Sequence, residues 1–181
     1  MGSDKGHLVY HSKSWAQHAY DKLKALDIVV NLSVNRQQQN NYEEGFSPNS
    51  LMVDVDLLSV KGPLLAVLSA HLKYPEEDLF LIACDLPLME TVVLKELVII
   101  YRQKINYEAY VFTNSDEPEP LCGIYTPKGL ARILVLLQQE KLARHSMKYM
   151  LSQLGVLYIP LPDEQKVCFC NFNEHSQLHG L

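Results

Sequence analysis

The sequence of 181 residues lacks the features that mark several large classes of protein. No apolar stretch approaches the roughly 20 residues that a membrane-spanning helix needs, and the first residues do not form the apolar core of a signal peptide. Low-complexity tracts and repeats of solenoid period are also missing. We therefore expect one cytoplasmic domain over residues 1–181, large enough to bury a core and without a membrane partner.

Positive charge is scarce as well. The chain has 16 Lys and Arg against 21 Asp and Glu, which gives a formal net charge of -5. A protein that grips nucleic acid or an anionic membrane electrostatically needs a basic face, so both partners are disfavoured. A polyanionic ligand would need help from individual lysines or from a metal ion.

Cysteine is limited to Cys84, Cys122, Cys168 and Cys170, and no CxxC pair occurs. The last two form a C-F-C pair with no matched Cys or His spacing elsewhere, which argues against a zinc site and does not indicate a disulfide. We expect reduced thiols.

Apolar segments alternate with helical patterns along the chain. Ser14 and Gln17 have the spacing of a capping box, and Gly62-Pro63 is typical of a helix start. The patterns predict helices at 14–26, 63–74, 90–103, 127–142 and 146–154, and strands at 27–34, 51–55, 79–84, 108–113, 121–126, 156–161 and 166–172. This alternation predicts an α/β fold: a three-layer, Rossmann-like, mainly parallel sheet with helices on both faces.

Acidic residues stand where two of the predicted strands end. Asp54 and Asp56 end one strand and Asp85 ends another. Ligands of such folds bind at the carboxyl ends of the strands, and two carboxylates that meet there need a positive charge between them, most simply a divalent cation. The alternative is that each acid only caps the turn or helix that follows it.

Five short motifs, in order, resemble those of a known family. They are Met1-Gly2-Ser3-Asp4-Lys5, Gly62-Pro63-Leu64, Cys84-Asp85-Leu86-Pro87, the segment 119–125 (EPLCGIY) and Asn171-Phe172-Asn173. Together they are similar to the motifs of the molybdenum cofactor guanylyltransferases, which have the fold of nucleotide-diphospho-sugar transferases. The resemblance covers essentially the whole chain.

The resemblance implies transfer of GMP from Mg-GTP to molybdopterin, with release of pyrophosphate. It implies that Asp85 holds Mg²⁺ and that Lys5 contacts the nucleotide phosphates. Further nucleotide-binding positions implied by the match are Asn35 and either Asp54 or Asp56, with Asp54 favoured because it lies in the apolar strand itself. Pro120, Leu121 and Asn173 would face the molybdopterin acceptor. Molybdoenzymes or their chaperones are the protein partners that this activity implies.

The sequence also departs from the family. There, a buried strand and a glycine-rich loop precede Met-Gly-x-Asp-Lys, so we expect either that the natural protein starts further upstream or that this form is impaired. The base pocket is largely built by that loop. Transfer of CMP to molybdopterin, transfer of a nucleotide to a sugar phosphate, and a non-catalytic relative that only holds molybdopterin or a nucleotide therefore stay open as alternatives.

Overall fold

The computed structural model describes residues 4–56 and 59–172. Its α-helices are α1 (Trp15–Lys24), α2 (Gln39–Glu43), α3 (Pro63–Lys73), α4 (Thr91–Gln103), α5 (Pro127–Gln138) and α6 (Met147–Leu151). Its strands are β1 (Val9–Tyr10), β2 (Lys13–Ser14), β3 (Leu32–Val34), β4 (Leu51–Val53), β5 (Leu79–Ile82), β6 (Ala109–Asn114), β7 (Glu117–Tyr125) and β8 (Val156–Pro160). Three short 3₁₀ helices complete it: η1 (Lys5–His7), η2 (Pro48–Ser50) and η3 (Asp163–Phe169).

The strands form a four-stranded sheet and two smaller ones. The larger sheet has the order β5-β7-β6-β8, in which β6 and β8 are parallel and β7 is antiparallel to both of its neighbours. β3 and β4 form a parallel pair, and β1 and β2 form a short antiparallel pair. Among the described residues, β3 and β5 each have a partner strand on one edge only.

The helices begin where the sequence provides caps. Ser14 accepts a hydrogen bond from the Gln17 amide at the start of α1, and Thr126 does the same for Gly129 at the start of α5. α3 starts after Gly62, whose φ of 67° is readily available to glycine, and places a proline in its first turn. The caps therefore satisfy amides that a helix leaves unpaired at its start.

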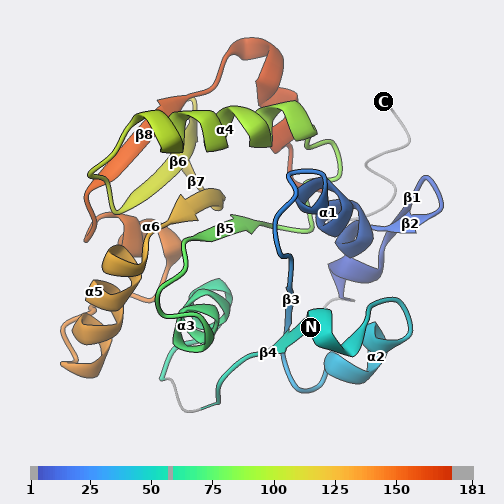
Figure 1. The fold of residues 1–181 in the computed structure, drawn as a ribbon, viewed down its shortest axis with the longest axis horizontal. Helices are drawn as coiled ribbons and strands as arrows, with labels where there is room; N and C mark the ends of the chain where they lie inside the picture. The colour runs from blue at the N-terminus through green and yellow to red at the C-terminus, as the bar shows by residue number, and fades with distance from the viewer. Residues whose placement is uncertain (1–3, 57–58, 173–181) are drawn as a thin grey trace.

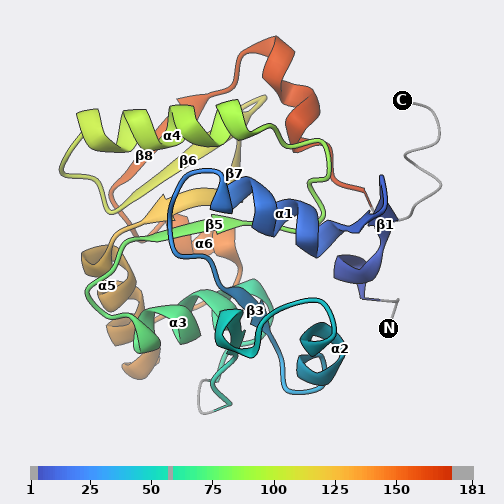
Figure 2. The ribbon, with the colours of Figure 1, turned by 45° about the vertical axis from the view of Figure 1, so that its right-hand side comes forward.

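Helices cover both faces of the larger sheet, as Figures 1 and 2 show. On one face, α4 and α1 enclose a core that includes Leu94, Leu97, Tyr110 and Phe112. On the other face, a second core joins residues of α3, α5 and α6 to the opposite side of the strands. The α/β fold with helices on both faces of the sheet is confirmed.

Several local expectations differ from the structure. The acidic segment after β6 is a tight turn, and β7 begins at Glu117, so the two strands form a hairpin and must be antiparallel. The strand expected at 166–172 is wrong, because Asp163–Phe169 form the 3₁₀ helix η3. Pro162 precedes η3 and two acids occupy its first turn, which favours a helical start. No described helix is long and apolar enough to span a bilayer.

Candidate active site

The short helix η1 connects the carboxyl ends of β3 and β5. Lys5 Nζ lies 3.1 Å from Asp85 Oδ2, just beyond β5. Gln38, just beyond β3, donates from Nε2 to Asp4 Oδ2 at 2.7 Å. The two strands therefore end near the same short segment, as expected for a site at the carboxyl edge of parallel strands.

The Lys5–Asp85 pair is accessible to a ligand. The side chain of Lys5 is 39% exposed and that of Asp85 is 23% exposed. Cys84 lies beside them, and its pKa rises to about 11 because the thiol is buried and lies near the negative charges of Asp85 and Asp4. The Lys5 ammonium thus lies among carboxylates. In this arrangement Lys5 can exchange Asp85 for a phosphate, and Asp85 can exchange Lys5 for a metal ion.

Asp4 holds η1 in place through three hydrogen bonds. Its carboxylate accepts from the Gly6 amide at 3.0 Å, from Tyr42 Oη at 3.0 Å and from Gln38. Burial, followed by the charge of Asp4, raises the pKa of Tyr42, so the phenol stays a donor. A Cβ on Gly6 would lie 2.0 Å from Tyr42 Oη, so only glycine fits there without a shift. No local sequence pattern reveals this network, because Asp4, Gln38 and Tyr42 are far apart in the chain.

An apolar groove of about 890 Å³ runs beside β5 to Asp85. Its two strand walls come from the segment leading into β3 and from β5, and its other two walls come from α1 and α3. Small side chains line both helical walls, namely Ala16 and Ala19 of α1 and Ala66 and Ala70 of α3. β5 lies between these two helices in Figure 2. The groove is therefore long and largely apolar, and the candidate site lies at one end of it.

The other predicted nucleotide residues lie at the ends of β3 and β4. Asp54 accepts a hydrogen bond from Ser33 Oγ at 2.7 Å, and burial raises the pKa of this carboxyl. Asp56 is more exposed and pairs with Arg36 at 2.8 Å. Ser33 and Asp85 both line the groove, so Asp54 lies one hydrogen bond from the groove wall.

Asn35 has a local role in the structure. Its Oδ1 accepts hydrogen bonds from the amides of Gln37 and Gln38, each at 2.9 Å, so it caps the turn that leads into α2. Gln38 is also the residue that binds Asp4. The Asn35 side chain thereby helps to set the position of Gln38 beside η1.

Two of the predicted acceptor residues, Pro120 and Leu121, lie on β7 beside the end of β5. The Leu121 carbonyl accepts from the Ala83 amide at 2.8 Å, and its side chain lines the groove. The Pro120 carbonyl accepts from Tyr125 Oη at 2.7 Å. Asn173 lies outside the described residues. Two of the three predicted acceptor residues therefore lie close in space to the segment that carries Asp85, although they are far from it in the chain.

Lys22 is a residue that the sequence pattern does not distinguish from the solvated lysines of α1. Its ammonium donates to the Pro87 carbonyl at 2.8 Å, within the loop that follows Asp85. Partial burial lowers the pKa of Lys22 to about 8. It therefore braces this loop, and only the packing of α1 against the loop could reveal that.

The donor set at Asp85 suits magnesium shared with a phosphate ligand. In the part of the chain that the structure describes, no three His, Cys, Asp or Glu side chains gather as a metal cage. Mg²⁺ is commonly held by one or two carboxylates together with substrate phosphates, and Asp85 offers such a carboxylate at the mouth of a groove. The residues present fit this mode of binding.

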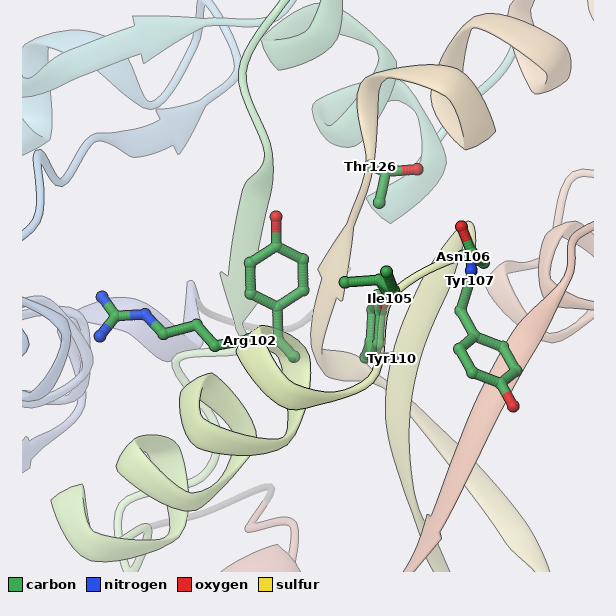
Figure 3. A pocket seen from close by; sticks show the side chains of 7 residues that line it. Arg102, Ile105, Asn106, Tyr107, Tyr110 and Thr126 are labelled. Atoms are coloured by element: carbon green, nitrogen blue, oxygen red, sulfur yellow. The ribbon is translucent and has the colours of Figure 1, made fainter.

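A second hollow, of about 370 Å³, lies at the end of the strands away from Asp85 (Figure 3). Arg102 and Ile105 at the end of α4 line it together with Tyr107, Tyr110 and Thr126. It borders the start of β6 and the end of β7, whereas Asp85 follows the end of β5. It shares Tyr101 and Arg102 with the groove but does not include Asp85.

Comparison with known proteins finds relatives of this chain. The chain is 32% identical over 130 residues to a molybdenum cofactor biosynthesis bifunctional protein of Synechocystis. The match covers 72% of this chain and 36% of that protein, so the chain spans about a third of that relative's length. It is 23% identical to a probable molybdenum cofactor guanylyltransferase of Flavobacterium johnsoniae, over 100% of this chain and 89% of that one.

A solved structure shares the fold. Molybdopterin-guanine dinucleotide biosynthesis protein A from Archaeoglobus fulgidus superposes with a TM-score of 0.77 at 18% identity, over 99% of this chain and 89% of that one. Residues 1–154 match the family described as the MobA-like NTP transferase domain. Since that match spans most of the sequence, the chain belongs to the MobA-like NTP transferase family.

Proposed function

We propose that this chain transfers GMP from Mg-GTP to the terminal phosphate of molybdopterin. An oxygen of that phosphate would attack the α-phosphorus of GTP, the bond from the α-phosphorus to the β-phosphate oxygen would break, and pyrophosphate would leave. The observation that carries the proposal is the Lys5–Asp85 pair at the carboxyl end of β5, in a chain of this family.

The two residues have different roles in the proposed reaction. Asp85 would hold Mg²⁺, which supplies charge neutralisation to the triphosphate. Lys5 would move from Asp85 to the phosphates and act there as a point charge. Because two anions must approach each other, positioning and charge neutralisation are the main needs of this reaction.

The remaining predicted residues divide between the two substrates. Asn35 and either Asp54 or Asp56, which surround the end of β3 and β4, would serve the nucleotide. Pro120 and Leu121, on β7, would face molybdopterin, and Asn173 is proposed there from the sequence motif. The partly buried Asp54 is the better candidate of the two acids, because its Ser33 partner lines the groove.

The test is release of pyrophosphate from GTP in the presence of Mg²⁺ and molybdopterin. The proposal expects release that needs all three components and is slower with CTP. A parallel thermal-shift titration measures nucleotide binding alone. Equal stabilisation by GTP and CTP would refute guanine specificity, and molybdopterin binding without any pyrophosphate release would favour the non-catalytic alternative.

A further inference from the structure

Glu119 is a half-buried carboxylate that has no donor of its own. It stands on β7 directly before Pro120 and Leu121, the two residues proposed to face the acceptor. Among the residues that the structure describes, its carboxylate makes no hydrogen bond or ion pair, and the nearby Lys148 of α6 is paired with Glu117 instead. Burial raises the pKa of Glu119, and the charge of Lys148 offsets this only in part. A ligand that brings N–H donors to Glu119 would therefore restore hydrogen bonds that burial removes.

The main chain around Glu119 is held rigidly. Pro118 and Pro120 flank it, and a residue that precedes a proline is restricted to extended conformations. The buried Tyr125 donates from its hydroxyl to the Pro120 carbonyl at 2.7 Å. The pairing of β7 with β6 is interrupted between Pro118 and Gly123, and such an irregularity redirects side chains from the regular ladder. A fixed main chain thus presents the Glu119 carboxylate, as recognition of a ligand requires.

Glu119 lies at the same end of the paired strands as the candidate site. Ile82, at the end of β5, pairs with Cys122 of β7 in antiparallel register. Three residues after Ile82 the chain reaches Asp85. Three residues before Cys122 stands Glu119, so both acids lie at one end of these two strands. The side chain of Leu121, two residues from Glu119, lines the groove that reaches Asp85. A ligand whose phosphate lies at Asp85 can therefore extend past Leu121 toward Glu119.

The shape of a carboxylate determines which ligand group it recognises best. Its two oxygens accept two parallel hydrogen bonds from a planar group with two adjacent N–H donors, as they do from arginine. The pterin ring of molybdopterin presents such an edge, because a ring N–H lies beside its 2-amino group. Guanine has the same edge, but the residues proposed for the nucleotide lie at the ends of β3 and β4, whereas Glu119 lies on β7 with the acceptor residues. The location of Glu119 therefore favours the acceptor as the source of the donors.

We propose that Glu119 determines specificity for the acceptor by accepting these two hydrogen bonds from the pterin ring. The inference rests on the proposed function, in which the terminal phosphate of molybdopterin reacts at the Asp85 end of the site. The pterin ring and this phosphate are opposite ends of the acceptor. Glu119 therefore selects the acceptor away from the reacting atoms, and it leaves the binding of GTP unchanged.

The test measures the binding of two ligands to the full chain without GTP. The ligands are 6-hydroxymethylpterin phosphate and the matching lumazine, in which an oxygen replaces the 2-amino group, and both are followed by their own fluorescence. We expect the wild type to bind the pterin about 10- to 100-fold more tightly than the lumazine, the range typical of hydrogen bonds to a charged group. Glu119→Gln should lose this preference, because an amide has one acceptor oxygen and turns an N–H₂ group toward the second donor. The matched control is Glu117→Gln, which removes the carboxylate that pairs with Lys148 and should keep the preference.

The two variants separate a role of Glu119 itself from an effect of Lys148. Loss of the preference in Glu119→Gln alone supports the inference. Equal loss in both variants, a Glu119→Gln variant that keeps the preference, or a wild type that has none would overturn it. Weaker thermal stabilisation by GTP in Glu119→Gln, with the pterin preference unchanged, would assign the carboxylate to guanine instead.

Failure of this inference is distinguishable from failure of the proposed function. A pterin preference that depends on Glu119, without any pyrophosphate release, would contradict the proposed reaction and leave the role of Glu119 standing. Pyrophosphate release with molybdopterin, in a chain that does not distinguish the pterin from the lumazine, would contradict only the role of Glu119.

Discussion

Asp85→Asn separates the chemistry of the candidate site from its contribution to stability. The substitution keeps the shape of the side chain and removes the charge that faces Lys5. Both partners of this ion pair are partly exposed, so its loss should cost at most about 1 kcal/mol in free energy of unfolding. For a chain of this size that lowers the melting temperature by no more than about 4 °C.

The effect on the reaction should be far larger. Removing a single group that stabilises developing charge costs about 2.7–4 kcal/mol in comparable sites, or a factor of about 100 to 1,000 in turnover. Loss of the carboxylate should also abolish the Mg²⁺-dependent part of GTP stabilisation. Pyrophosphate release and a thermal-shift titration with and without Mg²⁺ measure the two effects.

The control is Asp163→Asn, because this exposed carboxylate pairs only locally, with Lys166 at 2.6 Å. We expect the control to match the wild type in melting temperature to within about 4 °C and in turnover. Unchanged turnover in Asp85→Asn would refute the assignment of Asp85. A fall in its melting temperature of more than about 8 °C would show that the residue is mainly structural.

Three further predictions concern stability, measured by urea unfolding. Gly129→Ala should lower the free energy of unfolding by about 1–3 kcal/mol, because the added Cβ would lie 2.7 Å from the Glu108 carbonyl oxygen. The control is Gly45→Ala, which should be near neutral because its Cβ would meet nothing within 4 Å. Equal effects of the two substitutions would contradict the close packing of α5. Tyr42→Phe should lower the free energy of unfolding by about 1–3 kcal/mol, since it removes a hydrogen bond to the Asp4 carboxylate. A loss near zero would show that other contacts hold η1 in place. The stability of the wild type relative to Lys22→Met should rise as the pH rises from about 8 to about 10.5. The pKa of Lys22 is about 8 in the folded chain against a reference value of 10.5, so between these two values the unfolded wild type binds more protons than the folded wild type and stability rises. A stability difference between the two proteins that does not change with pH would refute the burial of a charged lysine.

The parts of the fold that the sequence predicts well are those set by local signals. Gly62-Pro63 starts α3 and Ser14 starts α1, because caps act within one turn of a helix. The acid that follows an apolar strand marks the carboxyl edge of the sheet, and Asp85 lies there beside Lys5. These features are predictable because each depends on residues that are close together in the chain, at the end of one helix or strand.

Features that depend on tertiary packing are harder to predict. Pro118 and Pro120 argue against a strand, yet both lie in β7, where the pairing with β6 shifts register between Val111 and Thr113 and the ladder is interrupted. The network around Asp4 joins η1 to α2, and the brace from Lys22 joins α1 to the Pro87 loop. No local pattern encodes such contacts, so only the structure reveals them.

The most direct test of the central claim is to locate the metal itself. Crystals of the chain with GTP and Mn²⁺ in place of Mg²⁺ allow the ion to be placed by its anomalous scattering. We expect an ion within about 2.2 Å of an Asp85 carboxylate oxygen, bound also to the triphosphate, with Lys5 moved onto the phosphates. An ion held by the triphosphate away from Asp85, with the Lys5–Asp85 pair intact, would contradict it.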